Sequence, residues 1–131
     1  MTVGLDTSVV LRLLVGKPES QLHKAIELLE TLARQGEQPV VSDLVIAEAY
    51  FALQHHYGVP KSEALQALRR MFAEGEIASS GAAADVLATT DLAKAKPGFV
   101  DRLIHREYTK GGGSMATFER SAQKLPSVRL T

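Results

Sequence analysis

The sequence predicts an α/β fold with a parallel sheet, and two observations predict it. Short apolar runs alternate along the chain with segments of helical periodicity, and such alternation favours a parallel sheet. The 131 residues, 45% of them hydrophobic, contain no internal repeat and no linker rich in Pro, Gly or Ser. That length suits one domain with a substantial core. We therefore expect a single α/β domain over residues 1–131.

The first third of the chain predicts a strand followed by two helices. The apolar run 3–5 indicates a strand, and the hydroxyls of Thr7 and Ser8 are expected to cap a helix over 9–14. A second helix is expected over 18–36. A proline opens it, apolar residues follow at helical spacing, and a glycine closes it.

The middle third repeats the pattern of a strand that leads into a helix. Residues 39–42 indicate a buried strand, after which Asp43 is expected to cap a helix that runs to Gly58. A proline then opens an amphipathic helix over 60–71. Its apolar face consists of Ala64, Leu65, Leu68 and Met71. A brief strand is expected over 76–78.

The last third predicts two more helices and two short strands. One helix is expected over 83–94, and Pro97 opens another that ends at the glycine tract 111–113. The apolar runs 115–117 and 128–130 indicate the last two strands.

Composition and charge limit the classes of function. Fifteen basic residues balance fifteen acidic ones, and the chain contains no cysteine. Disulfides and zinc–thiolate sites are therefore excluded. A phosphate-rich partner would have to be held by a local basic patch or by metal ions, because a net charge of zero provides no overall attraction to nucleic acid. No apolar stretch reaches the length of a bilayer span and residues 1–6 do not resemble a signal peptide, so we expect a cytoplasmic protein with no membrane association.

Acidic residues follow the predicted strands at several points. Asp6 follows the first strand directly, Glu48 lies one to two helical turns after the second, and Glu119 comes two residues after Thr117. Ligands of open α/β sheets bind beyond the carboxyl ends of the strands. These three acids, with Asp101 as a fourth, are therefore the candidate functional carboxylates.

Glu48 stands out because its helical neighbours are apolar. The residues three and four positions away on either side are Leu44, Val45, Phe51 and Ala52. We expect this face to point inward, where an isolated charge costs several kcal/mol unless it is paired, neutralised or bound to a metal. Asp101 lies at the border of the apolar stripe of its own helix.

Each acid also has a purely structural interpretation. Asp6 is suited to cap a helix, Glu48 to pair with a basic side chain, Asp101 to favour a helix N-terminus and Glu119 to lie in an ordinary loop. Gathered at one end of a sheet, however, the four would repel one another. A cation makes such a cluster favourable, and oxygen ligands without thiolates select Mg²⁺ or Mn²⁺.

Other candidate chemistry is weak. His55 and His56 are adjacent and point to different sides of their helix, so they predict a surface or helix-end role. The segment 111–114 lacks the following Lys and Ser/Thr of a phosphate-binding P-loop, and it precedes a strand rather than a helix. An aspartyl-phosphatase would need a second aspartate at position 8, which is Ser8.

Four segments together resemble a known family. They are residues 3–12 (VGLDTSVVLR), the pair Ala47-Glu48, residues 99–104 (FVDRLI) and residues 116–119 (ATFE). This pattern is similar to a PIN domain, most closely to the VapC-type toxin ribonucleases of prokaryotic toxin–antitoxin pairs. The resemblance implies a three-layer α/β/α fold around a short parallel central sheet. Glu119 stands where the family commonly has an aspartate, which leaves open whether one or two metals bind.

The resemblance also implies an activity, a cofactor and partners. These are Mg²⁺- or Mn²⁺-dependent cleavage of RNA, homodimerisation and inhibition by a cognate antitoxin protein. The expected catalytic and metal-binding acids are Asp6, Glu48, Asp101 and Glu119, with hydroxyls from Thr7 or Ser8. Candidates for a basic rim that contacts RNA phosphates are Arg12, Arg102, His105, Arg106 and Lys110. Two alternatives remain open, namely a catalytically silent protein- or RNA-binding module and a structure-specific DNA nuclease.

Overall fold

The strands form two separate parallel sheets. A computed structural model describes residues 1–131. β1 (Thr2–Gly4), β2 (Gln38–Val41) and β3 (Ala78–Ser79) form one sheet in the order β1-β2-β3, and β4 (Met115–Thr117) pairs with β5 (Val128–Leu130) in the other. All pairs are parallel, with Gly4 opposite Val40 and Thr117 opposite Leu130. The predicted α/β class with parallel strands is confirmed.

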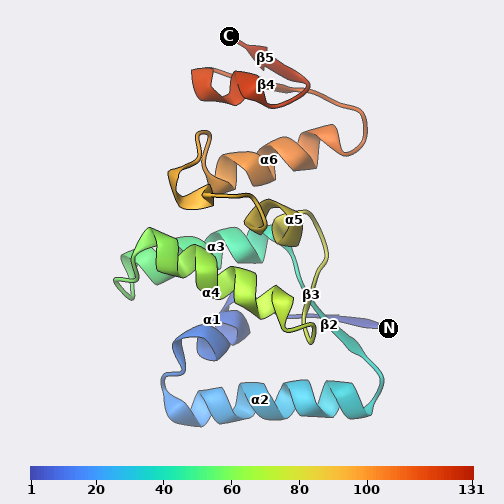
Figure 1. Cartoon of the computed structure of the whole chain (residues 1–131). Coiled ribbons are helices and arrows are strands. Elements are labelled where there is room, and N and C mark those ends of the chain that lie inside the picture. Colours follow the sequence, from blue (N-terminus) through green and yellow to red (C-terminus); the bar gives the residue numbers. More distant parts are fainter.

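Helices cover both sides of the three-stranded sheet. The helices are α1 (Thr7–Val15), α2 (Glu19–Arg34), α3 (Asp43–His55), α4 (Lys61–Ala73), α5 (Ala83–Leu87) and α6 (Phe99–Thr109), with single 3₁₀ turns η1 (Leu92–Lys94) and η2 (Arg120–Lys124). In Figure 1, α2 runs below the sheet and α3 and α4 lie above it, which gives the three layers. The longest helices therefore enclose β1, β2 and β3.

One hydrophobic cluster of 18 buried residues joins these layers. Its largest fully buried side chains are Phe99, Ile46, Leu68, Val10 and Val41. The face of α4 that the sequence predicted is the face that is buried, because its apolar residues recur at helical spacing. The two glycines expected to end α2 and α3 both adopt positive φ angles.

Two predicted elements differ from the observed ones. The helix expected over 83–94 ends at Leu87, and a separate turn follows Asp91, whose φ of 54° is incompatible with a continuous helix. The threonines at 89 and 90 are weak helix formers, which favours this break. The third strand begins at Ala78 instead of at residue 76.

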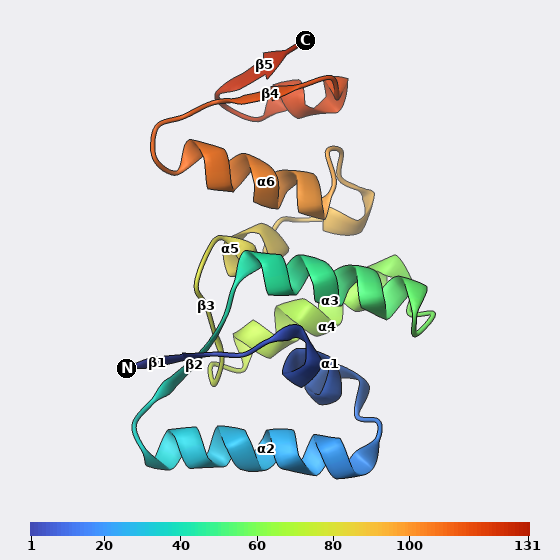
Figure 2. The same ribbon diagram turned by 180° about the vertical axis from the view of Figure 1, so that it is seen from behind.

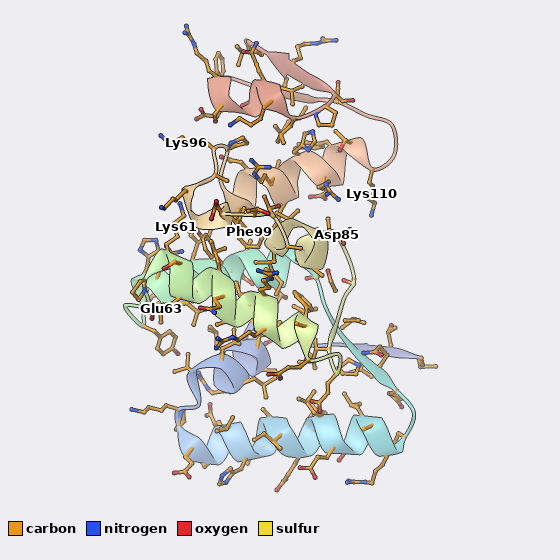
Figure 3. The ribbon with its side chains drawn as sticks, viewed as in Figure 1. Lys61, Glu63, Asp85, Lys96, Phe99 and Lys110 are labelled. Carbon is orange, nitrogen blue, oxygen red and sulfur yellow. The ribbon has the colours of Figure 1, made fainter.

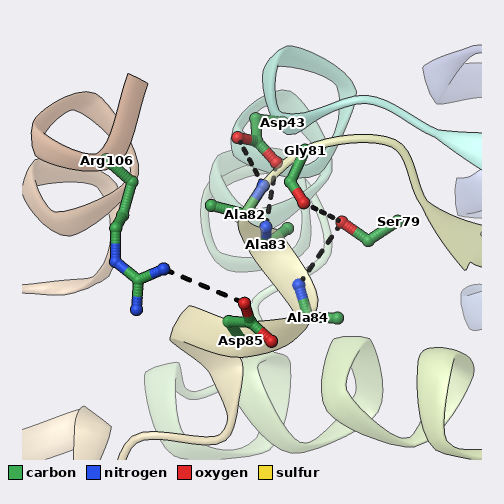
Figure 4. Close-up of polar contacts among 8 residues, drawn as sticks. All are labelled: Asp43, Ser79, Gly81, Ala82, Ala83, Ala84, Asp85 and Arg106. Atoms are coloured by element: carbon green, nitrogen blue, oxygen red, sulfur yellow. Dashed lines mark hydrogen bonds and ion pairs between the residues drawn. The ribbon is translucent and has the colours of Figure 1, made fainter. Parts of the chain in front are cut away.

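The cap of α3 differs from the prediction, and of the three candidate caps of α1 it is Asp6 that takes this role. Asp6 caps α1, and Ser42 caps α3 by accepting a hydrogen bond from the Val45 N–H. Asp43, the expected cap of α3, instead accepts hydrogen bonds from the N–H groups of Ala82 (3.1 Å) and Ala83 (2.9 Å) at the start of α5, as Figure 4 shows. One carboxylate thus links α3 to α5 across 39 residues of sequence.

Gly81 allows this link to form. A Cβ atom at position 81 would lie 2.6 Å from the carboxyl carbon of Asp43, closer than real Cβ contacts come. A side chain at this position would push the carboxylate away from the α5 N–H groups.

α6 is fixed to the main core at one end and to the two-stranded sheet at the other. Phe99 packs edge-on against Tyr50, with ring centroids 5.1 Å apart, and Leu103 is buried in the same cluster. His105 is also buried, and its Nε2 lies 2.6 Å from the Pro126 carbonyl oxygen, just before β5. His105 therefore cannot contact RNA phosphates, and its assignment to the basic rim is wrong.

The two sheets lie at different ends of the molecule. Figures 1 and 2, which view it from opposite sides, place α6, β4 and β5 at the end far from α2 and β1. None of the helices combines the length and the apolar character that a membrane crossing requires.

Replacing Asp43 by alanine is expected to lower the free energy of unfolding by about 1–3 kcal/mol, because two partly buried N–H groups lose their acceptor. Urea unfolding followed by circular dichroism measures this loss. The matched control is Asp85→Ala, since Asp85 is exposed and its single ion pair, to Arg106, spans 3.8 Å. That variant should lose less than about 1 kcal/mol. Equal losses in the two variants would contradict the role given to Asp43.

Candidate active site

Asp6 lies two residues beyond the end of β1 and is held by Ser8. Its Oδ1 accepts hydrogen bonds from the Ser8 hydroxyl (2.7 Å) and from the Ser8 N–H (2.6 Å). These two bonds, the hydroxyl first, lower the pKa of the Asp6 carboxyl below its ordinary value because they stabilise the charged form. Asp6 is therefore an exposed, oriented carboxylate at the carboxyl end of its strand.

Thr7 connects this strand end to α3. Its Oγ1 donates a 2.8 Å hydrogen bond to Oε1 of Glu48, 41 residues along the chain. Asp6 and Glu48 thus lie beside one another with a hydroxyl donated to each, one from Ser8 and one from Thr7. Either Thr7 or Ser8 was expected to orient an acid, and each of them does.

The face of α3 around Glu48 points outward, so the expectation of an inward face is wrong. Glu48 is exposed, and its neighbours Leu44 and Phe51 are 74% and 47% exposed. α3 is apolar on most of its circumference, and a different set of side chains faces the core. That set is Ile46, Ala49, Tyr50 and Leu53. One apolar face is therefore left without a partner.

Asp101 and Glu119 lie together in a second place. Both line a pocket of about 410 Å³ between the start of α6 and the segment that follows β4. Its basic lining residues are Lys61, Lys94 and Lys96. In Figure 3, Lys61 and Lys96 lie along the same edge of the molecule. The pocket therefore combines two carboxylates with three ammonium groups, and the lysines make it attractive to an anion such as a phosphate.

Glu119 repeats the local arrangement of Asp6. Its Oε1 accepts hydrogen bonds from the Ser121 hydroxyl (2.9 Å) and N–H (3.2 Å). These bonds lower the pKa of Glu119, and the charge of Lys96 lowers it further by a smaller amount. In both places a three-residue strand is followed by one apolar residue, the acid, and a serine two residues after the acid.

The four acids form two pairs and not one cluster. Asp6 lies with Glu48, and Asp101 lies with Glu119. No three Asp, Glu, His or Cys side chains of the chain are close enough together to hold a metal ion. The donor chemistry, carboxylates and hydroxyls, is that of Mg²⁺ or Mn²⁺, but neither pair alone offers the ligand number of such a site. Within one copy of the chain, the geometry therefore does not fit a bound dication.

The remaining rim candidates are dispersed. Arg12 donates to the side chains of Gln21 and Tyr57 near the end of α1. Arg102 donates a 2.8 Å bond to the carbonyl of Pro97, and Arg106 and Lys110 line a separate pocket of about 280 Å³. These residues do not make one basic patch.

The three lysines beside Asp101 and Glu119 were not predicted from the sequence. Lys94 and Lys96 flank a single alanine just before the proline that precedes α6. Two basic residues so close together, a few positions before the candidate acid Asp101, were the feature of the sequence that could have indicated a basic site. Nothing in the sequence indicated a role for Lys61, because it lies more than 30 residues before Lys94, at the start of α4.

Comparisons with known proteins give one positive result. The family model described as PIN domain matches residues 3–109, which includes Asp6, Glu48 and Asp101 but not Glu119. Neither the curated proteins nor the solved structures include a match to the chain.

Replacing Ser8 by alanine is expected to raise the pKa of Asp6 towards its ordinary value, because the hydroxyl bond is lost while the N–H at position 8 remains. A carboxyl whose pKa is lowered on folding adds stability above its unfolded pKa and loses it as the pH falls through the folded pKa. The variant should therefore be less stable than the wild type at neutral pH and approach it in acid. Carboxyl NMR titration and urea unfolding at both pH values measure these effects.

The matched control for that experiment is Ser121→Ala. It should raise the pKa of Glu119 and leave that of Asp6 unchanged. An unaltered Asp6 titration in Ser8→Ala would show that the serine does not set the charge state of this carboxyl.

Proposed function

The chain belongs to the PIN domain family, and from this premise we propose that it is a divalent-metal-dependent endoribonuclease, the toxin component of a type II toxin–antitoxin pair. PIN domains are generally nucleases, so a hydrolase acting on phosphodiester bonds is the coarse assignment. Metal dependence, RNA as the substrate and the toxin role are the finer parts of the proposal.

One observation carries the proposal. Asp6 and Glu48 are brought together at the carboxyl end of β1, and each accepts a hydrogen bond from a neighbouring hydroxyl. Oriented carboxylates at this edge of a parallel sheet are what a metal-assisted hydrolase requires. Both are exposed, so a phosphodiester could reach them.

The residues of the chain have distinct roles in the proposed reaction. When bound, Mg²⁺ or Mn²⁺ supplies Lewis-acid stabilisation of the phosphate and a water of lowered pKa. Asp6 and Glu48 are the pair that would contribute ligands at the carboxyl end of β1, and Ser8 and Thr7 orient them. The lysines beside Asp101 and Glu119 are suited to attract the RNA backbone. They replace the dispersed rim as the proposed phosphate contact.

The antitoxin is proposed to occupy a different surface. A groove of about 750 Å³ lies among α1, α2 and α4, with an apolar floor that includes Leu13, Ile26 and Met71. The polar and charged residues that line the groove are mostly acidic. They are Glu30, Glu37, Glu74 and Glu76, with Gln38 and Arg70 as the two exceptions. An amphipathic segment with basic flanks fits this combination of an apolar floor and an acidic rim.

Replacing Asp6 by asparagine is expected to reduce RNA cleavage by about 10²-fold or more, because a ligand worth several kcal/mol of charge stabilisation is lost. The fold should remain intact, since asparagine caps helices as well as aspartate does. A gel assay on labelled RNA measures the activity, and thermal unfolding checks the fold. Full activity of this variant would overturn the catalytic assignment.

The control is Glu27→Gln, which removes an exposed carboxylate of α2 that lines none of these pockets. It should cleave RNA at the wild-type rate. Single-stranded RNA, duplex DNA and branched DNA run in parallel distinguish the ribonuclease from a structure-specific DNA nuclease.

Adding Mn²⁺ in excess is expected to raise the melting temperature of the wild-type protein and to raise that of Asp6→Asn less, because a ligand bound by the folded state stabilises it. EDTA should reverse the shift and abolish cleavage. Differential scanning calorimetry measures both. If neither metal nor EDTA has an effect and no RNA is cut, the chain is the silent binding module.

A further inference from the structure

We propose that the outward face of α3, beside Asp6 and Glu48, is a track for an unpaired RNA strand. In this track one base stacks on Phe51, with His55 beside it, and Arg12 contacts a backbone phosphate further along. The placement of the strand rests on the proposed ribonuclease function. To that function it adds the form of RNA that is bound and the side chains that select it.

Phe51 and His55 lie on the same face of α3 as Glu48. Phe51 comes three residues after Glu48, and His55 comes four residues after Phe51. Residues at these spacings are neighbours on a helix. All three side chains are exposed, and the exposed fraction of Phe51 is 47%. A nucleotide whose phosphate lies at Glu48 therefore has its base within reach of the Phe51 ring.

The rings of Phe51 and His55 face the same way. Their planes are 20° from parallel, and their centroids are 6.3 Å apart. Phe51 also contacts Tyr50, whose ring is buried in the core and has its centroid 5.4 Å from that of Phe51. Rings held in this way form a platform for a base. Such stacking accepts any base, because every base has a π-face.

Arg12 provides a positive charge that no acid of the chain neutralises. Its guanidinium donates to the side chain of Gln21 and, over 3.3 Å, to the hydroxyl of Tyr57. Both acceptors are neutral, and neither ion pair of the chain includes Arg12. The side chain is thus held in place while its charge stays available. It is suited to bind a phosphate in addition to those at the three lysines.

Two contacts between α1 and α3 set the order of these groups. Thr7, the first residue of α1, donates to Glu48. Arg12, five residues later, donates to Tyr57, which lies just beyond the end of α3. Along α3 the acids therefore come first, the two rings come next, and Arg12 comes last. This order of acid, ring and cation matches the order of phosphate, base and phosphate along one RNA strand.

The track selects an unpaired strand. In a duplex the bases stack on one another, so a base reaches a protein ring only after it has been extruded from the helix at a cost. On the other side of Glu48, four residues earlier, the exposed side chain is Leu44, which has no ring. The base contact is therefore expected on the Phe51 side of Glu48 only.

A double-mutant cycle between protein and RNA tests the stacking. Every protein carries Asp6→Asn, which removes one of the charges that repel a phosphate, and EDTA is present to prevent metal-dependent cleavage. Fluorescence anisotropy follows the binding of a short unstructured RNA to this parent and to its variants. Phe51→Ala is expected to weaken binding by about 10-fold, the effect of losing one base–aromatic stack.

Removal of single bases from the RNA locates the contact. Abasic nucleotides are placed at each position in turn. At one position the loss of the base should weaken binding to the parent by a similar factor, and Phe51→Ala should then have no further effect. Such coupling shows that the side chain and the base contact each other, which a merely structural role of Phe51 would not produce.

Three further variants separate stacking from apolar contact. Phe51→Tyr keeps a ring and should bind as tightly as the parent, whereas Phe51→Leu keeps only apolar surface and should bind as weakly as Phe51→Ala. Leu44→Ala is the matched control, because Leu44 is exposed on the same helix without a ring. It should bind as the parent does. Thermal unfolding checks that every variant is folded.

Arg12→Gln tests the phosphate contact. The slope of the logarithm of affinity against the logarithm of salt concentration should fall by about 0.7, the value for one phosphate of a single strand. Phe51→Ala should leave this slope unchanged, because a stacked base carries no charge. An unchanged slope in Arg12→Gln would refute the contact between Arg12 and the RNA backbone.

Several outcomes overturn the track. They are a parent protein that binds no RNA, equal affinities of the parent and Phe51→Ala, and effects of Phe51→Ala and of base removal that add at every position. Tighter binding of a duplex than of its separate strands would also contradict the proposal. If light scattering shows a dimeric wild type and a monomeric Phe51→Ala protein, a second copy covers this face and the proposal is wrong.

The track and the nuclease function fail in different ways. If RNA binding depends on Phe51 but the wild-type protein with Mn²⁺ cleaves no RNA, the nuclease function is refuted and the track remains. If the wild-type protein cleaves RNA and Phe51→Ala changes neither binding nor cleavage, the track is refuted and the nuclease function remains.

Discussion

The position of the last third of the chain depends on the burial of Phe99 and Leu103. The edge-on packing of Phe99 on Tyr50 fixes α6 against α3, and the contact between His105 and Pro126 fixes β4 and β5 to α6. β4 and β5 therefore form a sheet of their own, separate from the three-stranded sheet. The separation of the acids into two pairs follows directly, because each pair belongs to the strand end of its own sheet.

The local elements were predictable from the sequence because they depend on short-range patterns. The buried face of α4, the glycines that end two helices and the strands β4 and β5 all follow from spacing of apolar residues or from backbone chemistry. The spacing of apolar residues in a helix does not show which side of that helix packs against the rest of the protein. α3 is apolar on nearly every side, so its pattern could not indicate which side the core would take, and Glu48 was expected on the wrong one. The burial of His105 was not predicted because it depends on a contact with the Pro126 carbonyl, 21 residues away in the sequence.

The candidate site was predictable in its residues and less so in its assembly. The acids and their hydroxyl companions follow strand ends, and strand ends can be found in a sequence. Asp6 and not Thr7 caps α1, because Thr7 is the first helical residue and its hydroxyl binds Glu48 on another helix, a partner that local sequence does not reveal. The lysines around Asp101 and Glu119 come from α4, from η1 and from the loop after η1, and the packing of α4 against η1 brings Lys61 to the pocket that the other two line.

The two serines that bind Asp6 and Glu119 have a consequence for the side-chain entropy of these acids. Asp6 and Glu119 are each immobilised by the residue two positions later, within their own stretch of backbone. Ordering a flexible side chain on association normally costs about 0.5–1.5 kcal/mol. Here that loss of rotamer freedom has already occurred in the isolated chain, so binding of a ligand by either carboxylate costs little side-chain entropy.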